Sequence, residues 1–411
     1  MRILHTADWH LGRTLFEAKL LDDQAYALDR LLEMVAETRP DAVVVAGDLF
    51  DRPVPPADAV RLLDDAFRRI VLGHGIPVVA IAGNHDSAER IDFGASLLSA
   101  GNLHIRGLAA LDCAPVVLAD AHGPVHLYPV PYAEPVAVRA LLQAEPPGPA
   151  RIDCHDAAMD ALCGRIRAAR PAGVRSVLVA HPFVAGGRES ESERPLAHVG
   201  GASAVRPATL AGFDYVALGH LHRPQTIGSG GGPAEGTAIR YSGSLLKYSP
   251  SEIGHTKSVS LVELGAPGTP PRIEEMPLAP RRDLRRIEGR LQDLLDMPPP
   301  GGREDYLVVR LTDRGPVFDA MTKLRQVYPN ALTIERLDPL AASGAPGVPR
   351  ADHRRQEPLD LFAAFWSETM GEELGPAERL AFLAALADEP EASEAGPSRP
   401  MGRNAASVEP V

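Results

Sequence analysis

Side chains that commonly bind metal ions follow apolar runs at five places in this sequence. In residues 42–51 an unbroken apolar run leads through Gly47 to the carboxylate of Asp48. Such a run is typical of a strand buried on both faces of a parallel sheet, and the functional groups of these sheets gather where the strands end. We therefore expect the whole series to meet at one edge of a sheet. Its other members are Asp8 and His10, Asn84 and His85, His181, and His220 and His222.

Apart from His85, the series supplies two carboxylates, one amide and four imidazoles. That is too many ligands for one tetrahedral ion, but it suits two ions about 3.5–4 Å apart, with the two oxygens of Asp48 able to bridge them. Such a pair of ions can bind both oxygens of an in-line displacement at phosphorus and provide hydroxide near neutral pH. His85 follows the ligand Asn84 directly and could protonate the leaving oxygen. The series thus predicts metal-assisted hydrolysis of a phosphate ester.

Two pairs in the series share one spacing. Asp8 and His10, like His220 and His222, are two residues apart, so each pair would project from one side of an extended strand and could bind one ion. Taken singly, each motif also has an ordinary structural explanation, because a carboxylate after a strand often caps the next helix and Gly-Asn-His-Asp suits a tight turn. The ordered combination of all five motifs is much less expected by chance.

The first hundred residues alternate strands with amphipathic helices. Apolar residues at helical spacing run from residue 28 to 35 and again from 60 to 71. This alternation predicts βαβ units with a parallel sheet, to which residues 103–130 are expected to add further strands. Later apolar runs predict a second sheet packed on the first, and they lie at 238–242, 257–264 and 272–276.

The chain changes character after residue 280. From residue 283 the pattern predicts a helix, a strand, a second helix and a second strand, which would form a small separate α/β unit. The segment 281–290 carries five arginines against two acidic residues, so it could contact phosphates or form a solvated helix face. Residues 359–370 and 377–386 form two amphipathic segments with more apolar surface than two short helices can bury alone.

Composition narrows the class of protein. A chain of 411 residues exceeds what one core usually holds, so more than one domain is expected. The formal charge of 42 − 54 = −12 gives no general attraction for nucleic acid, so DNA binding would need a local basic surface or a partner. Three cysteines without Cys-x-x-Cys spacing are expected to be reduced. We expect a cytoplasmic protein, because no apolar stretch has the length of a signal peptide core or a membrane span.

Five short motifs carry a family resemblance: HTADWHLG at 5–12, AGDLFD at 46–51, AGNHDS at 82–87, LGHLH at 218–222 and YSGS at 241–244. With them the sequence resembles the calcineurin-like metallophosphoesterase superfamily and, within it, the SbcD family of DNA repair nucleases. The resemblance implies an α/β fold, a four-layer sandwich of two sheets flanked by helices, with a small α/β capping domain and a C-terminal helical pair. It implies a nuclease domain at 1–280, a DNA-capping domain at 281–340, a linker at 341–356, partner-binding helices at 357–388 and a disordered tail at 389–411.

The resemblance also implies roles for single residues. His85 matches the catalytic histidine of the family. Carried over residue by residue, one metal ion would be bound by Asp8, His10, Asp48 and His222, and the other by Asp48, Asn84, His181 and His220.

The activity that the resemblance implies is a manganese-dependent DNA nuclease with two divalent ions, acting as an exonuclease on double strands and as an endonuclease on single strands and hairpins. It would work with the SbcC ATPase, in a heterodimer or heterotetramer, in DNA recombination, replication and repair. The family further implies a homodimer through the nuclease domain, binding to DNA ends and hairpins, and a place in the cytoplasm at the nucleoid.

Two other functions fit parts of the pattern. A phosphomonoesterase or cyclic-nucleotide phosphodiesterase could use the same core on a small substrate, although it would need little beyond that core. A binding scaffold without catalysis could share the fold, but the presence of every ligand type and of His85 speaks against it. The additional α/β unit and the apolar helical segments favour a large substrate and a protein partner.

Overall fold

The computed structural model divides the chain into two compact units. One comprises Met1–Thr312 and Asp319–Arg336, and the other comprises residues 313–318 and 337–411. The predicted linker at 341–356 and tail at 389–411 lie outside the described residues, and the predicted domain boundaries remain predictions. The described residues are 1–143, 152–193, 204–228, 236–298, 301–313, 315, 317–336, 359–360, 362–363, 366–367 and 371–387.

The first sheet has six strands in the order β14-β13-β1-β4-β5-β6. Strands β1, β4, β5 and β6 are parallel to one another. Strand β13 runs antiparallel to both of its neighbours, β1 and β14. Every residue of β4 and β5 is apolar and buried, as expected of strands covered on both faces. The bounds are β1 (Arg2–Thr6), β4 (Ala42–Val45), β5 (Val78–Ile81), β6 (Leu103–Arg106), β13 (Ser258–Glu263) and β14 (Arg272–Pro277).

The second sheet also has six strands, in the order β11-β12-β10-β9-β8-β7. Its four inner strands are parallel, and β7 and β11 run antiparallel at the two edges. The bounds are β7 (Val116–Asp120), β8 (Gly123–Pro129), β9 (Arg175–Ala180), β10 (Tyr215–Leu218), β11 (Gln225–Ile227) and β12 (Ala238–Tyr241).

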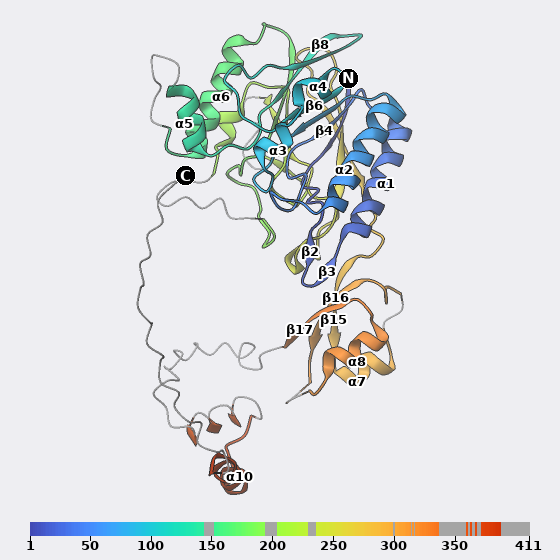
Figure 1. Ribbon diagram of the computed structural model, residues 1–411, viewed down its shortest axis with the longest axis vertical. Coiled ribbons are helices and arrows are strands. Elements are labelled where there is room, and N and C mark those ends of the chain that lie inside the picture. The colour runs from blue at the N-terminus through green and yellow to red at the C-terminus, as the bar shows by residue number, and fades with distance from the viewer. Residues whose placement is uncertain are drawn as a thin grey trace, which may run out of the picture. The chain divides into compact units, whose positions relative to one another are not determined.

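Helices cover the outer face of each sheet, which gives four layers. Side chains alternate along a strand, so Leu4 of β1 packs against the helices while Ile3 packs between the two sheets with Val177 of β9. Figure 1 shows α1 beside α2 and α5 beside α6. This architecture confirms the predicted fold class. The helices are α1 (Leu21–Thr38), α2 (Ala57–Arg68), α5 (Pro135–Gln143) and α6 (His155–Ala169), with the short elements β2 (Thr14–Leu15), β3 (Ala18–Lys19), η1 (Arg69–Gly73), α3 (Ala88–Asp92), α4 (Ala95–Ser99), η2 (Pro207–Leu210) and η4 (Pro250–Glu252).

The predicted division of strands between the sheets is wrong. The second sheet is built mainly from β7 to β10, which the sequence suggested would extend the first sheet. Of the three late strands only β12 joins the second sheet, because β13 returns to pair with β1 and β14 pairs with β13. Apolar strands of similar length look alike in a sequence, and nothing in their composition specifies the partner strand.

A small three-stranded parallel sheet follows, with α7 and α8 in contact with each other. The helix predicted from residue 283 is wrong at its start, because Leu284–Gly289 forms strand β15. Ile287, Leu291 and Leu294 fit a helical spacing, but the first of them lies in the strand and only the other two in α7. The bounds are β15 (Leu284–Gly289), α7 (Leu291–Asp296), β16 (Tyr306–Leu311), α8 (Ala320–Val327) and β17 (Ala331–Arg336).

For the arginine-rich segment, the helix in the alternative of a solvated helix face is wrong, because Leu284–Gly289 forms a strand, whereas Arg281, Arg286 and Arg290 are exposed. Arg282 donates from Nε and Nη2 to the buried carboxylate of Asp23 in α1, at 2.9 and 2.7 Å. Tyr306 of β16 donates to the same carboxylate at 2.8 Å. These three side chains attach the small α/β unit to α1.

The second compact unit contains α10 (Pro376–Ala387) and parts of the preceding amphipathic segment. The ring of Phe362 stacks on that of Phe382 with centroids 3.9 Å apart, so the two predicted amphipathic segments contact each other. The ring centroid of Trp366 lies 5.9 Å from that of Phe362. Phe365 lies outside the described residues. Within the described part of the chain, no helix has the length and apolar character needed to cross a membrane.

Candidate metal centre

The carboxyl ends of five strands meet, and they bring all seven predicted metal ligands and His85 together. The prediction of one sheet edge is corrected by the structure, since β1, β4 and β5 belong to the first sheet while β9 and β10 belong to the second. The two sheets pack face to face, so their strand ends lie next to each other. The side chains are Asp8, His10, Asp48, Asn84, His85, His181, His220 and His222, all of them buried except the half-buried Asn84.

Asp48 lies between two groups of nitrogen atoms. Its Oδ2 is 3.5 Å from Nε2 of His10 and 3.3 Å from Nε2 of His181. Nε2 of His10 is in turn 3.0 Å from Nε2 of His222. A carboxylate in this position can contribute to two ion sites at once.

Asn84 contacts the ligands of the second group, His181 and His220. Its Oδ1 is 3.1 Å from Nε2 of His181 and 3.2 Å from Nδ1 of His220. Asp8 belongs to both groups. An oxygen of Asp8 lies within 4.8 Å of ligand atoms of His10 and His222, and an oxygen of Asp8 also lies within 4.8 Å of ligand atoms of Asp48 and His181.

Four of these side chains stand on strained backbone. Asp8, His10, Asp48 and His220 have positive φ angles of 53°, 46°, 50° and 102°. The expectation that Asp8 and His10, and likewise His220 and His222, project from an extended strand is therefore wrong. Asp8 and His10 have left-handed φ angles after β1, and His220 has a positive φ angle after β10 has ended at Leu218. Positive φ is costly for residues other than glycine and is found where the surrounding structure fixes a functional group.

Two glycines allow the strand ends to approach this closely. A Cβ atom at Gly83 would lie 2.2 Å from Oδ1 of Asp48, and one at Gly219 would lie 2.0 Å from the carbonyl oxygen of Ala46. Neither contact is possible, so glycine is required at both positions.

Burial disfavours the charged form of several side chains in the centre. Burial raises the pKa of Asp8 to about 6. Burial alone would lower the pKa of His181, but the charge and hydrogen bond of Asp48, the charge of Asp8 and the carbonyl oxygen of Ala46 together raise that pKa to about 9. Burial lowers the pKa of His10 well below its usual range and that of His220 to about 3, so these two imidazoles are neutral and can act as ligands.

The donor set fits divalent cations. Oδ2 of Asp8 is buried and meets no hydrogen-bond partner among the described residues. The facing Nε2 atoms of His10 and His222 would both offer lone pairs to one ion. Mixed oxygen and imidazole ligands suit manganese, iron or zinc, so the ligands alone do not select among them.

His85 is oriented by two hydrogen bonds. Its Nδ1 lies 2.8 Å from the carbonyl oxygen of Asp51, to which it can only donate, and its backbone N–H donates to Oδ1 of Asp48 at 2.9 Å. Its ring centroid is 4.7 Å from that of His10. With Nδ1 committed to a carbonyl, Nε2 is the nitrogen that can exchange a proton with a substrate.

Several residues around the centre were missed by the sequence analysis. Gln24 donates from Nε2 to the carbonyl oxygen of His10 at 2.7 Å, and the Tyr248 hydroxyl donates to that of Trp9 at 2.6 Å, so together they hold the strained turn. Ser192 and Glu252 contact the His222 ring. Of these four residues, only Ser192 could have been suspected from the sequence, because it lies in a polar loop between two strands that are followed by predicted metal ligands.

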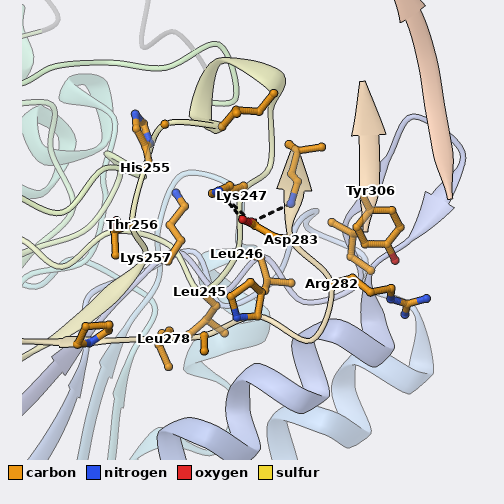
Figure 2. Close-up of a pocket in the computed structure, with 17 residues that line it drawn as sticks. Leu245, Leu246, Lys247, His255, Thr256, Lys257, Leu278, Arg282, Asp283 and Tyr306 are labelled. Carbon is orange, nitrogen blue, oxygen red and sulfur yellow. Dashed lines mark hydrogen bonds and ion pairs between the residues drawn. The ribbon is translucent and has the colours of Figure 1, made fainter. Parts of the chain in front are cut away.

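A cavity of about 380 Å³ lies apart from this centre. It is lined by residues that precede β13, by the segment that leads into β15 and by Tyr306, as Figure 2 shows. Lys247 pairs there with Asp283 at 2.9 Å. None of the eight residues of the centre lines this cavity, so we do not place the chemistry in it.

Two family models match the chain. Calcineurin-like phosphoesterase matches residues 1–224, which is more than half of the chain and contains all eight residues of the centre. The SbcD_C model, described as the type 5 capsule protein repressor C-terminal domain, matches residues 280–370.

Three solved structures are similar at low identity. A protein of Thermus thermophilus is 15% identical, with a TM-score of 0.39, 68% of this chain covered and 99% of that one. A dimetal phosphatase from Danio rerio is 11% identical, with a TM-score of 0.40 and coverage of 68% and 96%. The phosphoesterase Yfce from E. coli is 14% identical, with a TM-score of 0.26 and coverage of 68% and 100%.

Proposed function

This chain belongs to the calcineurin-like phosphoesterase family, and from that premise we propose that it is a dinuclear-metal DNA nuclease of the SbcD type. The observation that carries the proposal is the position of Asp48 between the nitrogen ligands of two groups, at 3.3 and 3.5 Å. One ion would be bound by Asp8, His10, Asp48 and His222, and the other by Asp48, Asn84, His181 and His220. We propose manganese as the ion.

The chain's own residues support hydrolysis of a phosphodiester. When bound, the two ions would neutralise charge on the phosphate and lower the pKa of water. Attack of hydroxide at phosphorus breaks the bond to the leaving sugar oxygen. His85, whose Nδ1–H is held by the carbonyl of Asp51, would act as the imidazolium and give its Nε2 proton to that oxygen, which leaves the ring neutral.

The family match of residues 280–370 favours DNA as the substrate. Residues 280–370 match the SbcD_C model, and the small α/β unit within this range is attached to α1 through Asp23. We propose that this unit is the DNA-capping domain, from residue 281 to 340. With a net charge of −12, the chain has no general attraction for a polyanion, so DNA binding would depend on a local basic surface or on the partner.

The test offers purified chain with Mn²⁺ four substrates: linear duplex DNA, hairpin DNA, bis(p-nitrophenyl) phosphate and p-nitrophenyl phosphate. We expect cleavage of both DNA substrates and of the diester. Hydrolysis of the monoester alone would favour a small-molecule phosphatase. No hydrolysis of any substrate by a chain that binds manganese would favour a scaffold.

We propose the SbcC ATPase as the partner of residues 357–388, in a heterodimer or heterotetramer. The stacked rings of Phe362 and Phe382 show that the two segments can form one small apolar body, and Leu380 and Leu383 of α10 are exposed. Apolar side chains presented on a short helical pair are typical of helix-in-groove contacts. The work of the complex would be DNA recombination, replication and repair in the cytoplasm, at the nucleoid.

A homodimer through the nuclease domain is supported by exposed large apolar side chains that lie close together in the sequence, in and between α3 and α4. Phe93 is 84% exposed and Leu97 is 81% exposed, with Leu98 next to them along the chain. Exposed patches of large apolar side chains commonly mark protein interfaces. Light scattering should give the mass of a dimer for the wild type and that of a monomer for Phe93→Ser with Leu97→Ser.

A further inference from the structure

The ring of His222 is held on the side away from His10 by two buried side chains. Nε2 of His222 faces His10 at 3.0 Å, whereas Nδ1 lies 2.7 Å from the Ser192 hydroxyl and 3.2 Å from Oε1 of Glu252. The Ser192 hydroxyl also makes a short hydrogen bond to Oε1 of Glu252. His222, Ser192 and Glu252 therefore form a closed triangle of polar contacts.

The direction of these hydrogen bonds follows from the number of protons available. A carboxylate only accepts, so the single hydroxyl proton of Ser192 goes to Glu252. Toward His222 the same hydroxyl oxygen can only accept, and Nδ1 must carry the proton. Nε2 is then unprotonated, with its lone pair directed to the proposed ion site.

Lys257 fixes the carboxylate. Its Nζ donates to the carbonyl oxygen of His222 at 2.7 Å, to the Ser244 hydroxyl at 2.9 Å, and at short range to Oε2 of Glu252. These three bonds use all three ammonium protons. Figure 2 shows Lys257 among the residues that line the cavity beside the small α/β unit.

Such a pair is costly to bury. The Glu252 side chain is 0% exposed and that of Lys257 is 4% exposed, and buried ion pairs of this kind often contribute nothing net to stability. Glu252 contacts the ring of His222, and Lys257 contacts its carbonyl oxygen. Groups that contact a metal-binding imidazole on the side away from the ion fix its tautomer and orientation, so this pair can position His222.

We propose that Ser192, Glu252 and Lys257 are positioning residues that hold His222 in the tautomer with a free Nε2, and so set the affinity of the ion bound by Asp8, His10, Asp48 and His222. The inference rests on the proposed metal centre and deepens it. The other ion has no ligand in contact with this network among the described residues, so the effect should be confined to one of the two ions.

The experiment titrates the full chain with Mn²⁺ by calorimetry. The wild type should bind two ions. Glu252→Gln, which can donate to Ser192 and reverse the chain of hydrogen bonds, should weaken one ion by about 10–100-fold and leave the other within about 2-fold. Glu263→Gln, an exposed glutamate on β13, is the matched control and should change neither.

Nitrogen NMR on histidine-labelled protein provides a readout that a merely structural role would not move. The wild type should show His222 protonated at Nδ1, and Glu252→Gln should move the proton to Nε2. If Glu252→Gln does not fold, Ser192→Ala replaces it, with the same ion weakened.

The outcomes separate the inference from the proposed function. Two ions with unchanged affinity in a folded Glu252→Gln or Ser192→Ala would overturn the positioning role and leave the metal centre intact. Equal weakening of both ions would also overturn it. A wild type that binds no manganese would overturn the proposed function itself.

Discussion

Nε2 of His10 and Nε2 of His222 face each other at 3.0 Å in the buried centre, although the two residues follow strands of different sheets. Two imidazole nitrogens at this distance need a proton or a cation between them. Burial lowers the pKa of His10 well below its usual range, so its imidazole is neutral and one of its ring nitrogens carries a lone pair. With both Nε2 atoms unprotonated, a divalent cation between them would satisfy both lone pairs, and the predictions below depend on that arrangement.

Asp48→Asn should reduce the number of bound ions while the fold persists. Asp48 has one oxygen 3.5 Å from Nε2 of His10 and 3.3 Å from Nε2 of His181, and it follows β4 at the end of the core rather than within it. Calorimetry with Mn²⁺ should show fewer than two ions per chain, with an unchanged far-UV circular dichroism spectrum. His220→Ala should also lose metal.

Asp64→Asn on the exposed side of α2 is the control for this change and should bind two ions. A normal stoichiometry and nuclease rate in Asp48→Asn would show that the centre is wrongly assigned.

His85→Ala should keep both ions and slow DNA cleavage by roughly 10²–10⁴-fold, the usual range for a positioned proton donor. Its Nδ1 is engaged with the carbonyl of Asp51, so the proton for the leaving group is expected from Nε2. Single-turnover rates and metal content should be measured on the same preparation. Loss of an ion would instead assign His85 as a ligand in the group that it forms with His10 and Asp51.

The chemistry of the centre could be predicted from the sequence because ligand type and order are local properties. Glycine before Asp48, Asn84 and His220 marked the strand ends, and the structure brings those residues together. The division of strands between two sheets could not be predicted, because β13 pairs with β1 across more than 250 residues of chain. Long-range pairing of this kind leaves no local pattern.

The residues that contact the ligands from outside the metal centre could not be predicted from the sequence either. Gln24 lies in the first turn of α1 and Glu252 in a short 3-10 turn, where polar residues are normally exposed. Only the folded chain brings Gln24 to the turn at His10 and Glu252 to the ring of His222. Likewise Arg282 could not be assigned a partner until α1 and β15 were placed together.

Arg282→Ala should destabilise the chain by about 2–3 kcal/mol, because it removes two charge-assisted hydrogen bonds from a buried carboxylate. Among the described side chains, the hydroxyl of Tyr306 would then be the remaining hydrogen-bond partner of the Asp23 carboxylate. Urea unfolding gives the free energy, and hydrogen exchange should show faster opening of β15 and β16. Arg281→Ala, its exposed neighbour, should have little effect, and equal exchange in both variants would contradict the attachment.

Phe365→Ala combined with Trp366→Ala should abolish co-purification with the SbcC ATPase and spare both metal binding and hydrolysis of bis(p-nitrophenyl) phosphate. Aromatic anchors at the centre of an interface contribute up to a few kcal/mol each. Trp366 contacts Phe362 within its own segment. If the variant melts early and still binds the ATPase, these rings serve the chain's own packing.

The most direct test of the metal centre is anomalous scattering at the manganese edge from crystals grown with Mn²⁺. The account predicts two peaks that share Asp48, one also in contact with Asp8, His10 and His222 and the other with Asn84, His181 and His220. A single peak, or peaks away from Asp48, would contradict it.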